Sequence, residues 1–144
     1  MKVLVQRCDK ASVTVDNKIV GSIGKGMMIL VGFTETDTSE NIDYMVDKVL
    51  NLRIYDDESG IMNKSILDVG GSILSVSQFT LYADTRKGRR PSYINALNGE
   101  KAVVLYEEFN KKLKEHIHVE TGIFGAEMKV ELINDGPITI MLEK

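Results

Sequence analysis

The chain has 144 residues, 43% of them hydrophobic and 27% charged, and a formal net charge of −3. This length fits one domain and this composition is ordinary for a globular protein, which excludes a disordered chain, a repeat array and a bulk nucleic-acid binder of the histone type. Cys8 is the only cysteine, so an intrachain disulfide and a zinc site built on thiolates are excluded. With no signal peptide and no stretch long enough to cross a membrane, we expect a protein of the cytoplasm that binds no membrane.

The first quarter of the chain predicts strands. Apolar and β-branched residues, in runs or in alternation with polar ones, mark residues 2–7, 11–15, 18–23 and 27–33. Asp16 and Asn17 predict a turn that joins the second and third of these segments into a hairpin. The fourth segment is continuously apolar, which is typical of a strand covered on both faces.

Two segments predict helices. Asp37, with Glu40 three residues later, predicts a capping-box start for the first. Its apolar face would consist of Ile42, Met45, Val46, Val49 and Leu50. The second is expected from about Asn98 to His116, with lysines late in the helix, where the helix dipole favours cations. Its apolar face would consist of Ala102, Leu105, Tyr106, Phe109 and Leu113.

The remaining segments are extended or irregular. Residues 72–79 predict a second buried strand, and residues 85–92 predict a loop. Alternation over residues 128–133 predicts a strand, which residues 134–137 would turn into a last strand over residues 138–142. The sequence therefore predicts a single α+β domain over residues 1–144, with a strand-rich core and two main helices packed on it.

Conventional catalytic groups are scarce. His116 and His118 lie near the expected end of a helix, where the dipole favours a cation, so we interpret them as structural. We expect Cys8 to be a small core residue. The carboxylates of residues 56–60 are expected in a solvated turn. The sequence contains no nucleophile elbow, phosphate-binding glycine loop or zinc-binding helix motif, so we expect no metal site and no required cofactor.

Three segments carry unusual chemistry. Hydroxyls and an amide gather at the end of an apolar strand in residues 75–84, where backbone N–H groups become free to bind a substrate oxygen; the alternative is a strand that runs into a polar loop. Four cations surround Gly88 and could neutralise RNA phosphates, although such clusters are often only solvated surface. They are Arg86, Lys87, Arg89 and Arg90. Gly136-Pro137 is a turn signal or a cis peptide bond, and the sequence leaves both open.

These segments, in order along nearly the whole chain, resemble the D-aminoacyl-tRNA deacylase family. The matching stretches are Val5-Gln6-Arg7, Ala11-Ser12-Val13, Ser77-Gln78-Phe79-Thr80-Leu81, the loop of residues 85–92 and residues 134–139. The resemblance implies hydrolysis of the ester of D-aminoacyl-tRNA, with tRNA as the partner and L residues rejected. It also implies a homodimer with a barrel-like β structure and active sites at the subunit interface.

The resemblance also assigns roles to residues. The catalytic wall of the pocket would consist of Ser77, Gln78, Phe79 and Thr80. Gly136 and Pro137, held cis, would enter the pocket of a second copy to bind the substrate, with Arg7 holding them in place. Arg86, Lys87, Arg89 and Arg90 would bind RNA. Two other hypotheses fit composition and spacing alone: an RNA-binding dimeric module without catalysis, and a purely structural dimeric domain.

Overall fold

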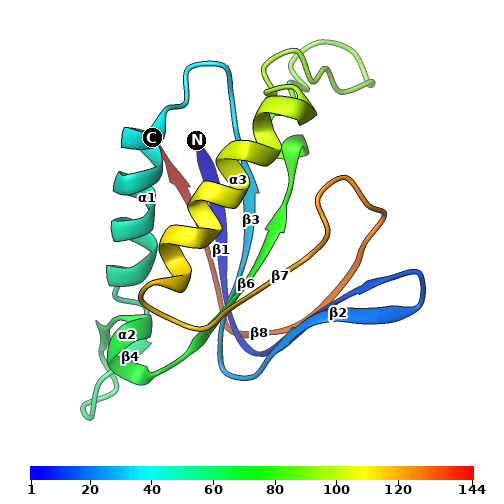
Figure 1. The fold of residues 1–144 in the computed structure, drawn as a ribbon. Coiled ribbons are helices and arrows are strands. Elements are labelled where there is room, and N and C mark those ends of the chain that lie inside the picture. Colours follow the sequence, from blue (N-terminus) through cyan, green and yellow to red (C-terminus); the bar gives the residue numbers. More distant parts are fainter.

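One long strand organises the sheet. The computed structural model describes residues 1–144, and β1 (Lys2–Val15) pairs in it with three other strands. β2 (Lys18–Ile23), β3 (Gly26–Gly32) and β8 (Lys129–Glu143) are all antiparallel to β1. β8 runs the full length of β1, whereas β2 and β3 pair with its two halves in turn (Figure 1). Residues 2–7 and 11–15, expected as separate strands, thus form one strand.

The sheet curls into a nearly closed barrel. β3 pairs in parallel with β6 (Ser72–Ser77), and β6 pairs in parallel with β7 (Val119–Thr121), giving the order β2-β1-β3-β6-β7. The two ends of this path approach each other, because a Cβ added at Gly21 in β2 would lie 2.8 Å from the Thr121 carbonyl oxygen in β7. This close approach requires glycine and confirms the barrel-like, strand-rich fold.

Helices cover one face of the sheet. In Figure 1, α3 (Gly99–Lys114) crosses in front of the strands and α1 (Ser39–Asn51) stands to their left. The buried residues of both helices join a cluster of 22 core residues with β1, β3 and β6. A second cluster of seven, including Cys8, fills the inside of the curl. The remaining elements are short: β4 (Tyr55–Asp56), β5 (Met62–Lys64), α2 (Ile66–Val69) and the 3-10 helix η1 (Phe79–Tyr82). None of the helices is long and apolar enough to cross a membrane.

The two main helices form where the sequence predicts them, but the expected start of the first is wrong. α1 begins at Ser39, and the preceding Thr38 N–H donates to Asn41 Oδ1 at 3.0 Å. Asp37 does not cap α1, because its carboxylate accepts from the Met1 ammonium at 2.5 Å and from the Thr34 N–H at 2.8 Å. Asn98 does cap α3, accepting from the Lys101 N–H at 3.1 Å.

The turn expected at residues 134–137 is also wrong, because β8 continues through it. Asn134 pairs with Cys8 and Thr139 pairs with Gln6, so residues 135–138 of β8 stand opposite Arg7 alone. The chain therefore bulges out of the ladder instead of reversing. Pairing with β1 on both sides of the bulge overrides the local turn signal. The Gly136–Pro137 peptide bond within the bulge is cis.

Candidate functional site

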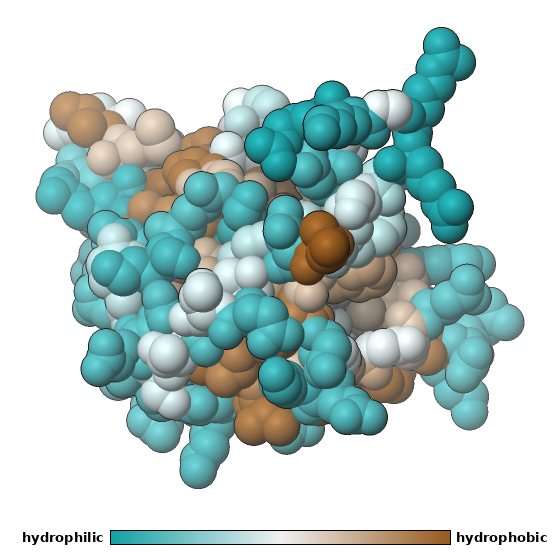
Figure 2. Space-filling view, turned by 90° about the horizontal axis from the view of Figure 1, so that it is seen from above, coloured by the Kyte–Doolittle hydropathy of each residue, from teal (hydrophilic) through white to brown (hydrophobic).

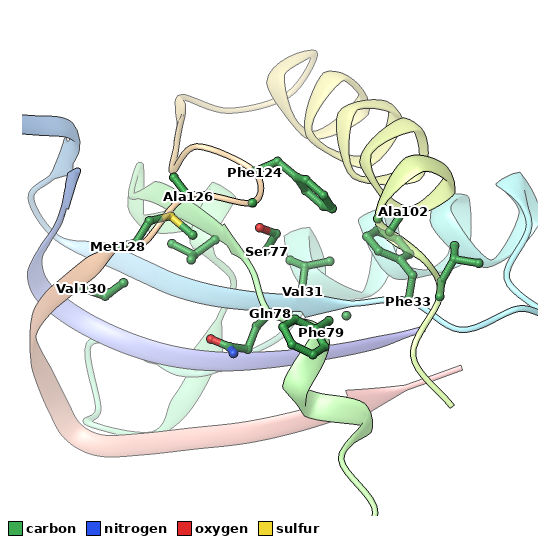
Figure 3. A pocket seen from close by; sticks show the side chains of 15 residues that line it. Val31, Phe33, Ser77, Gln78, Phe79, Ala102, Phe124, Ala126, Met128 and Val130 are labelled. Carbon is green, nitrogen blue, oxygen red and sulfur yellow. The ribbon is translucent and has the colours of Figure 1, made fainter. Parts of the chain in front are cut away.

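A cavity of about 570 Å³ opens at the end of β6 (Figure 3). The ends of β3 and β6 form its floor, and the start of α3 and the segment from Phe124 to Met128 form its walls. Most of its lining is hydrophobic, with polar side chains from Ser77 and Gln78. An apolar cavity with a few convergent polar groups is typical of a binding site for a small organic group.

Backbone N–H groups become free at this end of β6. The Gln78 N–H donates to the Val31 carbonyl at 2.7 Å, and the first bond of η1 runs from the Leu81 N–H to the Gln78 carbonyl at 3.3 Å. The N–H groups of Phe79 and Thr80 therefore have no carbonyl acceptor within η1. Since Phe79 lines the cavity, these groups are positioned to donate to an oxygen bound there.

The Thr80 hydroxyl accepts a hydrogen bond from the Gln78 side-chain amide. An amide is not a base, so this partner does not withdraw the hydroxyl proton and does not make Thr80 a strong nucleophile. Thr80 is half-buried and lies outside the lining of the cavity, whereas Ser77, Gln78 and Phe79 belong to it. The structure thus brings three of the four expected wall residues to the cavity surface and places the fourth beside them.

Arg7 lies behind the bulge of β8. It is buried; its Nη1 donates to the Ile54 carbonyl at 2.6 Å and its Nε lies 2.9 Å from the Asp135 carboxylate. Gly136 has φ +116°, and a Cβ there would lie 3.3 Å from Arg7 Nη2 and 2.8 Å from Ile138 Cγ1. Only glycine combines this backbone conformation with such close neighbours.

Asn134 is a further residue of this segment, to which the sequence assigned no role. Its Nδ2 donates to the Arg7 carbonyl at 2.9 Å and to the Ile138 carbonyl at 3.0 Å, so it closes the base of the bulge. The bulge then projects Gly136 and Pro137, both exposed. Neither residue lines the cavity of its own chain. The expected site residues therefore form two separate groups in one copy.

The basic loop is closed at its base. Asp84 and Ser92 form an isolated bridge with backbone hydrogen bonds of 2.8 and 3.0 Å, and residues 85–91 between them are exposed. Arg86 is held by the Asp84 carboxylate at 2.9 and 2.6 Å, and this pairing keeps the pKa of Asp84 far below its usual value. The other three cations, Lys87, Arg89 and Arg90, have no ion pair. Figure 2, seen from this side, shows hydrophilic side chains standing out from the body.

The conventional catalytic residues lie elsewhere. His116 and His118 follow α3, and His118 Nε2 lies 2.9 Å from the Glu120 carboxylate. Cys8 is buried in the barrel, where burial raises the pKa of its thiol to about 11. No three of the histidine, cysteine and acidic side chains group closely enough to hold a metal ion. The polar groups available in the cavity are therefore backbone groups and neutral side chains.

Sequence reasoning missed one wall of the cavity. Phe124 belongs to the segment between β7 and β8 and lies in no periodic pattern. The sequence places Met128 only in a strand and Ala102 only on the apolar face of a helix, without indicating that either faces a cavity. The one available signal was an aromatic residue, Phe124, between two glycines, Gly122 and Gly125. Such a signal marks a loop without saying which cavity the loop faces.

Two solved structures show the class of fold to which this chain belongs. One, described as c-Myc DNA Unwinding Element Binding Protein, superposes with a TM-score of 0.95 at 42% identity and covers 100% of this chain and 99% of its own. Another, described as a probable eukaryotic D-amino acid tRNA deacylase, has a TM-score of 0.84 at 20% identity and covers 98% and 97%. The second shares the nearly closed barrel and its helices, and at this identity the likeness concerns the fold alone.

Sequence comparison then gives the family. Residues 4–143 match the family described as D-Tyr-tRNA(Tyr) deacylase, and the chain belongs to it. A D-aminoacyl-tRNA deacylase of Bacillus velezensis is 58% identical over 144 residues, which cover 99% of this chain and 98% of the relative. One from Clostridium kluyveri is 56% identical over 99% and 97%. The enzyme is accordingly a D-aminoacyl-tRNA deacylase, a hydrolase.

Proposed function

We propose that the cavity at the end of β6 binds the aminoacylated 3′ end of tRNA and that the enzyme is a proofreader of amino-acid chirality in the cytoplasm. The observation that carries this proposal is the pair of free N–H groups of Phe79 and Thr80 beside an apolar cavity. The ester bond joins a D-amino acid to the terminal adenosine. Attack on its carbonyl places negative charge on the carbonyl oxygen, which these N–H groups are positioned to stabilise.

The chemistry requires little more than this stabilisation. One donor of this kind is worth on the order of a hundredfold or more in rate. The ester is activated and lies next to the 2′-hydroxyl of the terminal ribose, which can help to activate water. Substrate assistance fits the positions of the histidines and Cys8, since none of them lines the cavity. Thr80 then acts through its position and backbone, with its hydroxyl tied to Gln78.

The proposed site combines two copies of the chain. Gly136 and Pro137 project from β8 but do not line their own cavity, so a second copy is the natural recipient of the bulge. β8 pairs with β1 along one side only, which leaves an open edge of 15 residues available to a partner. Arg7 and Asn134 hold the bulge at its base. The homodimer proposed here is symmetric, with each copy giving and receiving one bulge.

The selectivity of the enzyme for D-amino acids follows from steric exclusion of L side chains. In this proposal the carbonyls of Gly136 and Pro137 hold the substrate amino group, and an L side chain would then point into the bulge. Selection rejects L residues without reading the D side chain, so D residues of different size should all be substrates. Glycyl-tRNA should also be hydrolysed slowly, because glycine has no side chain to exclude. Complete inertness of glycyl-tRNA at high enzyme concentration would contradict exclusion by sterics alone.

The direct test is release of D-tyrosine from D-tyrosyl-tRNA, measured beside the L form. We expect rapid loss of the D form only. Loss of neither, with tRNA still bound, would favour the second candidate, a non-catalytic RNA-binding dimer, for which the three unpaired cations Lys87, Arg89 and Arg90 of the exposed loop are the supporting observation.

Mixing two inactive variants tests the shared site. Gly136→Ala disables the bulge and leaves the cavity intact, whereas Ser77→Trp fills the cavity and leaves the bulge intact. Random pairing of equal amounts makes half of the dimers mixed, each with one wild-type combination, so the mixture should recover about a quarter of the wild-type activity per chain. Failure of the mixed, refolded sample to exceed either variant alone would contradict a site shared between copies.

A further inference from the structure

A second cavity, of about 420 Å³, lies on the other side of Phe124. It is bounded by α3 and by the segment from Thr121 to Phe124, and Tyr106, Asn110 and the lysines 111 and 114 line it. Phe124 lines both cavities, and its ring lies 5.8 Å from that of Tyr106, so this aromatic pair stands between them. Figure 3 shows Phe124 pointing toward α3 from the loop.

Asn110 has an unused acceptor in this second cavity. Its side chain is 5% exposed, yet its Oδ1 has no hydrogen-bond partner. A buried, unpaired amide oxygen costs stability, because it has lost water without gaining another donor. The neighbouring Tyr106 hydroxyl donates to the Ser75 carbonyl at 2.8 Å, so its proton is not available to Asn110 Oδ1. A ligand that brings an N–H group into the cavity would supply the missing donor.

The rim of the cavity is cationic on balance. Lys111 and Lys114 are exposed and have no ion pair, in contrast to Lys112, which is held by Asp43 and by Glu108 at 2.9 Å. Glu107 also lines the cavity and is exposed, so the rim holds two cations and one anion. Free lysines beside a buried amide are a combination suited to a nucleotide, whose base carries hydrogen-bonding groups and whose backbone carries phosphates.

The two cavities follow one another along α3. Ala102 lines the first, Tyr106 and Asn110 line the second, and Lys114 closes it. At 1.5 Å rise per residue the distance from Ala102 to Lys114 along the helix axis is about 18 Å. This path is long enough for a single RNA strand to lie with its last nucleoside in the first cavity and the preceding nucleotide in the second.

We propose that the second cavity binds the cytidine that precedes the terminal adenosine of tRNA. All mature tRNAs end in cytidine–cytidine–adenosine, so one cavity for this cytidine would serve every tRNA. Asn110 Oδ1 accepts a hydrogen bond from the exocyclic amino group of cytosine, Tyr106 and Phe124 contact the base, and Lys111 and Lys114 bind the backbone phosphates. This inference rests on the proposed function, because it requires the adenosine in the first cavity.

The experiment compares D-tyrosyl-tRNA with D-tyrosyl-adenosine, which lacks the cytidine. For Asn110→Leu, the ratio of kcat/KM on the tRNA to kcat/KM on the adenosine ester should fall roughly fivefold to tenfold, the effect of one lost hydrogen bond. For Lys111→Ala with Lys114→Ala, the ratio should also fall, and the slope of log kcat/KM against log salt should become shallower by roughly one. Lys48→Ala, a cation of α1, is the matched control and should leave the ratio unchanged.

A tRNA with 2-pyrimidinone in place of that cytosine tests the same contact without altering the protein. The wild type should lose the same fivefold to tenfold on it, and Asn110→Leu should lose nothing further. An equal loss on both substrates in Asn110→Leu, or indifference of the wild type to the missing amino group, would overturn the inference while leaving the proposed function standing. If the wild type hydrolysed neither D-tyrosyl-tRNA nor D-tyrosyl-adenosine, the proposed function itself would be refuted.

Discussion

Substitution of Gly136 by alanine probes the bulge of β8 at the point where its geometry is tightest. The φ of +116° is unfavourable for any residue with a Cβ, at a cost of about 1–3 kcal/mol. The new Cβ would also lie 2.8 Å from Ile138 Cγ1 and 3.3 Å from Arg7 Nη2, so the bulge has to shift away from its support. Because displacement of a binding group by about 1 Å can cost a hundredfold in rate, we expect a loss of at least that size in D-tyrosyl-tRNA deacylation.

Gly60→Ala is the matched control. Gly60 also has a positive φ, +73°, but a Cβ there meets nothing within 4 Å. We expect a loss of about 1–2 kcal/mol in the free energy of unfolding for this variant, with full activity. Urea denaturation at one protein concentration gives the free energies, and single-turnover deacylation gives the rates. Activity within threefold of the wild type in folded Gly136→Ala would refute the reasoning that the bulge belongs to the active site.

Three further changes test other parts of the site. Thr80→Ala should keep deacylation within roughly tenfold of the wild type, since the hydroxyl has no adjacent base; total loss in a folded variant that still binds tRNA would make the hydroxyl essential. Replacing Lys87, Arg89 and Arg90 together by alanine should raise KM for tRNA, make the salt slope shallower by roughly two, and spare D-tyrosyl-adenosine. Cys8 should resist iodoacetamide at pH 8 until the protein unfolds. Folding raises the pKa of the Cys8 thiol from 9.0 to about 11. The stability that this shift contributes is therefore present below pH 9.0 and is lost as pH rises toward 11. The free energy of unfolding of Cys8→Ala should not show this decrease.

Local patterns predicted the elements whose partners are close in sequence. The second helix begins after Asn98 as expected. Its cap is local, because the Asn98 side chain accepts from the Lys101 N–H only three residues away. Only the start of the first helix was misplaced, because Asp37 binds the Met1 ammonium, 36 residues away, and no local pattern reports this partner. The same limit applies to β8, since the pairing that carries it past residues 134–137 comes from β1 at the other end of the chain.

The candidate site divides in the same way. Ser77, Gln78 and Phe79 were found because a polar cluster at the end of an apolar strand is visible in the sequence. Phe124 was not, because it belongs to a loop without periodicity, and the alternation that includes Met128 predicts a strand without showing that it faces the cavity. Asn134 and Asn110 were missed for a third reason: an asparagine is common in turns and on helix surfaces, and only burial and hydrogen-bond partners separate these two from ordinary ones.

The bridge between Asp84 and Ser92 makes the basic loop independent of the barrel that carries it. The loop is closed by two backbone hydrogen bonds at its base, and no residue from 85 to 91 is buried. Insertions, deletions and charge changes within it would therefore leave the core packing unaltered. Under the proposed function, exchange of this one exposed segment would change the affinity for tRNA without altering the cavity proposed for hydrolysis.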